Sequence, residues 1–406
     1  MGHEVRAIDG AEAEAWLRQL SHAFFMQPTD GPPEYFLAHA DLSRCFGAFD
    51  GTAVVGTLRS FANELTVPGR AAVPVSALTM VSVASTHRRH GILTEMITTD
   101  LRDSASRGEV ASILLASEYP IYSRFGYGPA TQRARFDIAT VGLRFLPESS
   151  GSVEIIDLSA MRTLAPPLFE RFRASQHGAI GRSEAWWDRM TGVTTSPGSE
   201  PFKGTQAVYR APSGELEGYV TYDGKMQWEQ FPLSATMTVH ELVATTPDAY
   251  LGLWEYCCSV DLQNAVVAPT RVPDEVLGLL VADARRVKLA EVSDFLWVRL
   301  LDTPSALSAR TYEGAGRLVV EVVDDLGFAG GRFALEGDES GATCSPTTQS
   351  AELTISVADL GAAYLGLGTW TRLAAAGRVD EHVHGAVARA EAMFRTAREP
   401  WCTTFF

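Results

Sequence analysis

The sequence predicts an α/β protein, in the wide sense that includes α+β folds, built from three mixed regions in tandem. First, segments with helical periodicity alternate with short apolar, β-branched runs typical of strands. Second, the first region runs from a hairpin to a strand and a helix, and the second region repeats this order. Third, the length of 406 residues suffices for about two to four domains.

The first region begins with a helix over 11–25, where Trp16, Leu20 and Phe24 recur at helical spacing. A hairpin over 45–59 follows, because Asp50-Gly51 is a strong turn signal between two apolar runs. We then expect a strand over 75–83, a helix over 87–107 and a buried strand over 110–116.

A polar, Pro/Gly/Ser-rich break over 145–157 separates the first region from the second. The second region has expected strands over 206–210, 216–222, 235–244 and 295–300, with a helix over 250–260. The third has strands over 317–323, 333–336 and 351–356 and helices over 357–365 and 381–395. We therefore predict domains at residues 1–145, 146–300 and 301–406.

The composition of the chain restricts the kinds of molecule that it is expected to bind and the compartment in which it is expected to lie. The formal net charge of −15 repels nucleic acid and anionic membranes and favours cationic partners, although the same charge also serves solubility. No apolar run approaches the roughly 20 residues that span a bilayer, and the first residues carry no apolar signal segment. The five cysteines are scattered, which is typical of reduced thiols. We expect a cytoplasmic protein.

The most informative stretch is a strand that runs through a basic turn into a helix. Arg88 and Arg89 supply full positive charges, and Gly91 brings no Cβ near the backbone. The N-terminus of the following helix offers unpaired N–H groups and a positive dipole end. The stretch predicts a site for the phosphates of a cofactor; an exposed basic turn is the plain alternative.

The Arg88-x-x-Gly91 spacing after an apolar strand resembles motif A of the GNAT acyltransferases. Longer stretches resemble the mycobacterial Eis (enhanced intracellular survival) proteins, namely the run over 117–128 (SEYPIYSRFGYG), the run over 296–300 (LWVRL) with Pro304-Ser305-Ala306-Leu307, and an aromatic C-terminal residue. The resemblance covers all three regions.

This resemblance implies two tandem GNAT-like domains, the second degenerate, followed by a domain like sterol carrier protein. It implies acetyl-CoA as cofactor, acetylation of amino groups in aminoglycosides or other cationic amines, and a homohexamer. The second region has Thr245-Thr246-Pro247-Asp248 at the corresponding turn, without Arg or Gly. We expect one cofactor per chain, in the first domain.

The resemblance also implies roles for individual residues. Tyr122 is the general acid, and the terminal carboxylate, here on Phe406, reaches the substrate site. The cofactor is implied to contact the main chain of the strand, the basic turn and a serine, namely Val81, Val83, Arg88, Arg89, Gly91, Ile92 and Ser117.

Elementary chemistry agrees with these roles. An amine attacks the thioester carbonyl, a strand N–H can stabilise the oxyanion, and a phenol with a pKa of about 10 can protonate the leaving thiolate. The α-carboxyl, with a pKa of about 3.5, is too acidic to act directly as a strong base, so Phe406 either works through water or holds the cationic substrate. Chain ends often fray, but residues 401–406 (WCTTFF) are apolar enough to dock.

Other residues have weaker patterns. Phe24, Phe36 and Met80 are candidate walls of the substrate pocket, with core packing an equal alternative. Trp186-Trp187 indicates an interdomain helix rather than a ligand platform. His382 and His384 are two positions apart and do not share a helix face, so we assign no metal site.

Three interpretations of the sequence stay open. The chain is either an Eis-like N-acetyltransferase or a natural-product tailoring N-acyltransferase that uses the same scaffold with another amine or acyl donor. In a third reading, the sterol-carrier-like region binds an apolar ligand and the acyltransferase site is vestigial. The basic turn, Tyr122 and the apolar C-terminus favour an active enzyme.

Overall fold

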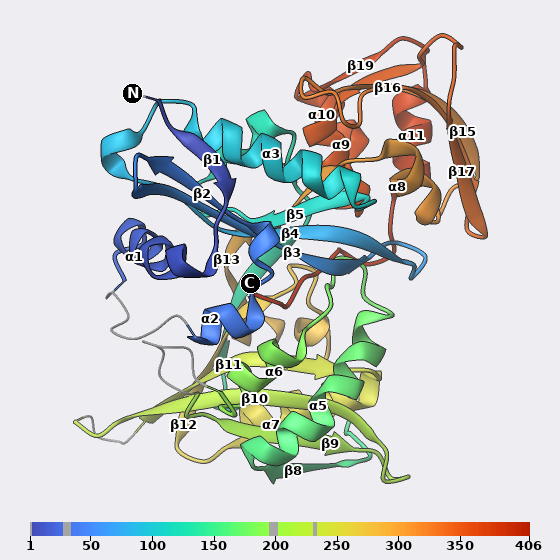
Figure 1. Ribbon diagram of the computed structural model, residues 1–406. Helices are drawn as coiled ribbons and strands as arrows, with labels where there is room; N and C mark the ends of the chain where they lie inside the picture. The colour runs from blue at the N-terminus through green and yellow to red at the C-terminus, as the bar shows by residue number, and fades with distance from the viewer. Residues whose placement is uncertain (1, 27–33, 195–201, 230–233) are drawn as a thin grey trace.

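The computed structural model describes residues 2–26, 34–194, 202–229 and 234–406. Within these residues it has three sheets, each covered by helices, which confirms the predicted fold class. The first domain and the C-terminal domain lie side by side, and the middle domain packs beneath the first (Figure 1). No helix in the described ranges is long and apolar enough to cross a bilayer.

The first sheet is mixed, and its strands alternate between two packing faces. Phe46 and Ala48 pack under one helix, whereas Cys45 and Phe49 face another, as expected for a strand with a period of two. In spatial order its described strands are β1 (Glu4–Ala7), β2 (Cys45–Asp50), β3 (Ala53–Thr66), β4 (Ala72–Val83), β5 (Ala111–Leu115), β14 (Leu296–Leu300) and β6 (Gly128–Pro129). Its helices are α1 (Ala13–Ala23), α2 (Glu34–His39), α3 (Ile92–Ser106) and α4 (Tyr119–Tyr122).

The second sheet also buries both faces. Ala207 and Tyr209 pack against one helix, while Val208 packs with two others on the opposite face. In order its described strands are β13 (Val287–Asp294), β7 (Gln132–Ala139), β12 (Gln263–Arg271), β11 (Ser234–Ala244), β10 (Leu216–Gln227), β9 (Thr205–Arg210) and β8 (Ser152–Ile156). Helix α7 (Pro247–Ser259) covers the first face; α5 (Leu158–Arg173) and α6 (Glu184–Met190) cover the second.

The C-terminal domain has a smaller sheet whose core is continuous with that of the first domain. Helix α9 (Val357–Tyr364) packs very closely on the first domain. A Cβ at Gly128 would lie 1.9 Å from the carbonyl oxygen of Ala358 in this helix. Its described strands, in order, are β17 (Gly341–Pro346), β16 (Gly331–Asp338), β15 (Gly316–Val323), β18 (Leu353–Ser356) and β19 (Val379–Glu381). Its helices are α8 (Thr303–Ala309), α9 (Val357–Tyr364), α10 (Trp370–Ala375) and α11 (Ala386–Phe394).

The first two sheets each take one strand from the sequence range predicted for the other domain. Strand β7 lies within residues 1–145 but pairs with β12 and β13 in the second sheet. Strand β14 lies within residues 146–300 but pairs with β5 and β6 in the first. The chain therefore crosses between the two sheets twice, and this exchange of strands joins the two domains.

Three local predictions need correction. The helix expected from residue 87 begins at Ile92, because Arg89 and Gly91 have φ of 68° and 82°, which no α-helix accommodates. The polar break over 145–157 contains strand β8. The helix expected from residue 381 begins at Ala386, since Glu381 ends strand β19.

Candidate active site

Strands β4 and β5 separate within the first sheet and leave a strand edge open. Their parallel pairing runs from Val75 with Ala111 to Leu78 with Leu114 and stops there. Beyond Leu78, β4 has no described partner on that side, so its main-chain groups as far as Val83 are available to a ligand. A bulge opposite β3 marks the same point: Met80 has a φ of 55°, and Thr57 Oγ1 donates a hydrogen bond of 2.8 Å to its carbonyl oxygen.

The basic turn after β4 ends at a helix start without a capping side chain. Gly91 is the N-cap of the 15-residue helix α3, and no side chain accepts a hydrogen bond from its first turn. Arg88 and Arg89 are exposed, and neither forms a hydrogen bond or ion pair with any described residue. Free N–H groups and two unpaired arginines are the donors that a diphosphate requires.

Tyr122 lies at the end of α4, a turn that starts with Pro120 near its first position. The side chain is buried and packs edge-on against Tyr127, with ring centroids 6.2 Å apart. Tyr127 is anchored in turn by a 2.7 Å hydrogen bond with Ser112. Burial raises the pKa of the Tyr122 phenol above its ordinary value, and a hydrogen bond with Ser117 opposes this rise.

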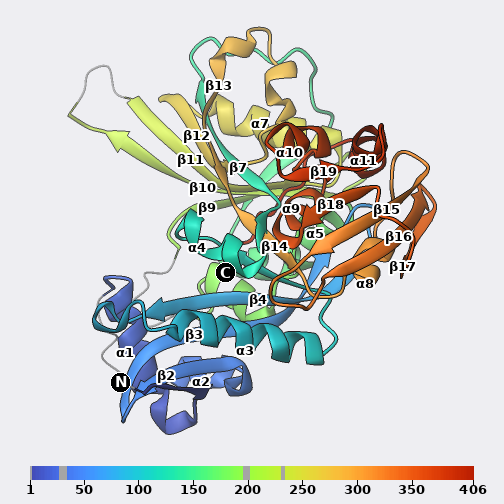
Figure 2. The ribbon, with the colours of Figure 1, turned by 90° about the horizontal axis from the view of Figure 1, so that it is seen from above.

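The C-terminal segment runs from the third domain into the space between the other two, so that the C-terminus lies near the centre of the molecule (Figures 1 and 2). Trp401 and Cys402 are buried, and the Trp401 N–H donates to the carbonyl oxygen of His177 at 3.0 Å. The ring of Phe406 packs edge-on against Phe61, with centroids 5.7 Å apart. The segment is docked through Trp401, Cys402 and Thr404, which are buried, whereas Phe405 is largely exposed.

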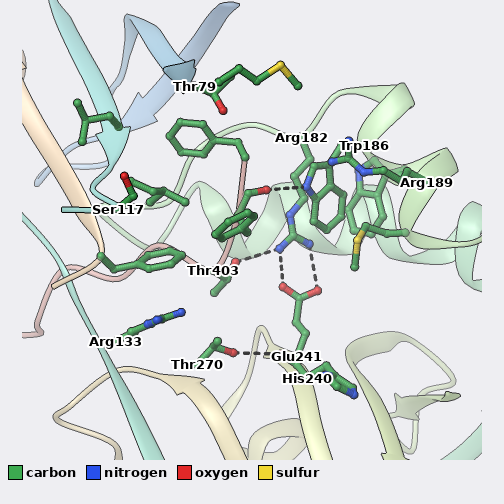
Figure 3. A pocket seen from close by; sticks show the side chains of 18 of the residues that line it. Thr79, Ser117, Arg133, Arg182, Trp186, Arg189, His240, Glu241, Thr270 and Thr403 are labelled. Carbon is green, nitrogen blue, oxygen red and sulfur yellow. Dashed lines mark hydrogen bonds and ion pairs between the residues drawn. The ribbon is translucent and has the colours of Figure 1, made fainter. Parts of the chain in front are cut away.

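A cavity of about 910 Å³ at the junction of the first two domains is lined by the open part of β4, by Tyr122 and by the C-terminal segment, but not by the basic turn (Figure 3). Its volume lies within the usual range for small-molecule sites. Its lining residues relevant to function come from all three domains: Phe24, Met80, Val81, Ser117, Tyr122, Arg133, Arg182, Trp186, Arg189, Glu241, Phe295, Thr403, Phe405 and Phe406.

The separated strands, the uncapped helix start and the buried tyrosine form one arrangement, and sequence comparison identifies its family. Residues 4–130 match a model described as an acetyltransferase (GNAT) domain, residues 178–300 match a second model with that description, and residues 303–403 match a sterol carrier protein domain. N-acetyltransferase Eis of Mycobacterium tuberculosis is 32% identical over 86% of this chain and 85% of its own length. The chain belongs to the Eis family of GNAT N-acetyltransferases.

Two further relatives agree. An uncharacterized N-acetyltransferase of Streptomyces avermitilis is 42% identical over 99% of this chain and 98% of its own length. The crystal structure of Eis1 from Mycobacterium abscessus superposes with a TM-score of 0.88 at 32% identity, covering 99% of this chain and all of that one. As an Eis-family member, the protein is an acetyltransferase that uses acetyl-CoA.

Of the three residues suggested as walls of the substrate pocket, the structure of this Eis-family chain places two in the cavity wall and one in the hydrophobic core. Phe24 and Met80 line the cavity. Phe36 instead stacks on Trp16, with centroids 5.2 Å apart, in the core formed by α1 and α2. Its selection as a wall is therefore corrected to core packing, the alternative that its residue type allowed.

Sequence reasoning missed the polar centre of the cavity. Arg182 donates to both carboxylate oxygens of Glu241 and to the hydroxyls of Thr403 and Thr404, at 3.1 and 3.0 Å (Figure 3). Its guanidinium lies 3.9 Å from the centroid of the Trp186 ring, and Trp186 Nε1 donates to the carbonyl oxygen of Phe405. The Trp186-Trp187 helix is thus part of the cavity wall, although the sequence indicated only an interdomain helix.

The described residues hold no group of three or more His, Cys, Asp or Glu side chains placed to bind a metal ion. His382, considered above with His384, shares a 2.8 Å hydrogen bond with Thr354 in the third domain.

Proposed function

We propose that the chain transfers the acetyl group of acetyl-CoA to an amino group of a small cationic amine that enters the interdomain cavity. The observation that carries the proposal is the convergence of the open β4 edge, the buried Tyr122 and the C-terminal Phe406 on one cavity. Aminoglycosides are the acceptors that the family resemblance implies.

The free donors of the first domain support a position for acetyl-CoA. The main chain at Val81 and Val83 would hold the pantetheine arm beside Ser117. The phosphates would be bound by the helix start and the basic turn, at Arg88, Arg89, Gly91 and Ile92. Bound acetyl-CoA supplies the acetyl group as a thioester.

In this proposal Tyr122 supplies the proton for the leaving group. Its raised pKa keeps the phenol protonated at neutral pH. The phenol can therefore donate a proton from Oη to the sulfur as the thiolate departs. Ser117 lines the same cavity as the phenol and would lie beside the departing sulfur.

The terminal carboxylate of Phe406 would bind the amino group of the substrate and take up its proton. With an ordinary pKa of about 3.5 it is ionised at neutral pH. It can hold an ammonium group and accept its proton through water. Docking of residues 401–404 and the packing of Phe406 on Phe61 support a fixed position for this group. A chain extended beyond Phe406 should lose activity and keep its fold.

A hexameric assembly belongs to this proposal on family resemblance alone, and a cytoplasmic location belongs to it on the scattered cysteines. Light scattering of the purified chain tests the assembly. A mass of six chains of 43.9 kDa would support it, and a monomer would contradict it.

The proposed function is tested by thiol release from acetyl-CoA against a panel of amines: aminoglycosides, polyamines, lysine-containing peptides and arylalkylamines. Amine-dependent thiol release, with acetylated amine detected by mass spectrometry, would support it. Acetyl-CoA at 100 times its Kd should also stabilise the fold by about 2.7 kcal/mol. No thiol release with any amine and no thermal stabilisation would contradict it and favour a ligand-binding protein.

A further inference from the structure

The charges inside the cavity are the opposite of those on the whole chain. The chain carries a formal net charge of −15, but the described cavity wall presents Arg133, Arg182 and Arg189 against one acidic side chain, Glu241. A polycationic acceptor attracted by the surface would therefore meet positive charge inside.

Glu241 is not available to a substrate. Both of its carboxylate oxygens accept hydrogen bonds from Arg182, and one of them also accepts from Tyr219 at 2.8 Å. The Arg182 side chain is itself fully buried. This ion pair is thus internally neutralised. Among the described lining residues, the terminal carboxylate proposed on Phe406 would be the remaining negative group.

Two arginines on opposite walls of the cavity remain uncompensated (Figure 3). Arg133 donates from Nε to Ser293 Oγ at 3.2 Å and lies over the Phe295 ring at 5.4 Å. Its two terminal nitrogens have no hydrogen-bond partner among the described residues, and the Arg189 side chain has none among them either. The Arg133 guanidinium is held in place at Nε, and its two terminal nitrogens are free to donate. It is therefore suited to bind the two oxygens of a planar carboxylate.

A third arginine stands behind this wall. Arg59 has no carboxylate partner in the described ranges, and its Nε is buried without a hydrogen bond. Burial lowers the pKa of Arg59, and the nearby charge of Arg189 lowers it further. The cavity wall around Arg189 therefore carries positive charge both at its surface, on Arg189, and behind it, on Arg59.

The rest of the cavity is mostly aromatic and partly open. Phe24 and Phe405 are 45% and 69% exposed, which are large fractions for rings that line a cavity. Phe202, Phe295 and Trp186 add further aromatic surface. Such walls gain free energy by covering an apolar ligand, at about 25 cal/mol per Å².

From this arrangement we propose that the preferred acceptor is a primary amine on an aromatic body that also carries a carboxylate, which pairs with Arg133. The proposal rests on the proposed function and narrows its substrate class. In the transfer, the amine nitrogen forms a bond to the acetyl carbon and the thioester C–S bond breaks. The amine nitrogen loses its proton through water to the Phe406 carboxylate and then to solvent. The sulfur gains a proton from Tyr122, and the resulting phenolate regains one from solvent.

The test compares acceptors that differ in one group. 4-(Aminomethyl)benzoate and 4-methylbenzylamine share ring and amine, and only the first has a carboxylate; spermidine and kanamycin represent polycations. We expect kcat/KM for the benzoate to exceed that of each other amine by at least about tenfold, the ratio that corresponds to 1.4 kcal/mol. Preference for either polycation would overturn the inference while leaving the proposed function intact.

Variants locate the effect. R133Q should lower kcat/KM for the benzoate about tenfold and leave 4-methylbenzylamine unchanged, and R133K should restore part of the loss. R285Q is the matched control, because it removes one positive charge from a side chain that is 92% exposed and outside the cavity wall. An equal effect of R133Q on both amines, or none on either, would overturn the inference.

A binding measurement separates the two proposals. Calorimetric titration of the benzoate into the CoA-loaded protein should give a weaker Kd for R133Q than for the unmodified chain. If no amine is acetylated but this difference appears, the proposed function fails and the carboxylate site stands. If acetylation proceeds without the difference, the carboxylate site fails alone.

Discussion

The docked C-terminal segment gives a prediction whose size follows from two hydrogen bonds. Arg182 donates from Nε to Thr404 Oγ1 at 3.0 Å and from Nη2 to Thr403 Oγ1 at 3.1 Å. The double substitution T403V/T404V removes both acceptors with little change of shape. Hydrogen bonds to charged groups contribute about 1.5 kcal/mol each at the low end, so docking should weaken by about 3 kcal/mol.

The assay is hydrogen exchange of the C-terminal peptide. The Trp401 N–H, which donates to His177, reports opening of the segment, and 3 kcal/mol corresponds to about 100-fold faster exchange in water. kcat/KM should fall while acetyl-CoA affinity is unchanged, because Thr403 and Thr404 are remote from the basic turn. T354V in the third domain is the control. Unchanged exchange of the peptide, or equally faster exchange throughout the chain, would refute the reasoning.

Three further predictions concern the cofactor turn and two buried carboxylates. R88Q/R89Q removes two unpaired charges at the helix start, so the Kd of acetyl-CoA should rise by about tenfold or more with kcat at saturation unchanged; a lower kcat at unchanged Kd in calorimetry and kinetics would contradict this. D324N breaks the buried pair in which both Asp324 oxygens accept from Arg299 at 2.8 Å, and it should cost about 3–5 kcal/mol in denaturant unfolding, whereas a loss below about 1 kcal/mol would speak against the pair. Burial raises the pKa of Asp100 to about 6 from 3.8. A raised carboxyl pKa stabilises the fold at low pH and loses that contribution as pH rises from about 4 through 6, on the order of 3 kcal/mol for this shift. The stability of the unmodified chain relative to D100N should therefore fall between pH 4 and pH 8, and a pH-independent difference would exclude this role.

The cofactor turn around Gly91 could be predicted because the residues that indicate it are contiguous in the sequence. The apolar strand, the basic turn and the helix occupy one stretch around Gly91, and the positive φ of that residue is what glycine allows. The helix start was placed too early, since the left-handed backbone at Arg89 has no signature in residue type. The apolar C-terminus indicated docking, and Trp401 is buried as expected.

The non-local part could not be predicted because strand partners are chosen in three dimensions. Nothing in the composition of β7 or β14 tells which of two sheets each joins. The Arg182–Glu241 pair joins positions 59 apart, and its threonine acceptors come from a third domain. Phe36 shows the limit for single residues, since an aromatic ring suits a pocket wall and a core equally well.

The proposed acetyl transfer depends most directly on Tyr122. Y122F removes the phenol hydroxyl and leaves the ring that packs on Tyr127; Y119F, on a ring that is 56% exposed in the same turn, is the control. Single-turnover thiol release, with acetyl-CoA affinity measured calorimetrically on the same samples, separates chemistry from binding. If Tyr122 is the general acid, Y122F lowers the single-turnover rate by about 10²–10⁴-fold at unchanged acetyl-CoA affinity. Near-full turnover of Y122F with acetyl-CoA bound would contradict it.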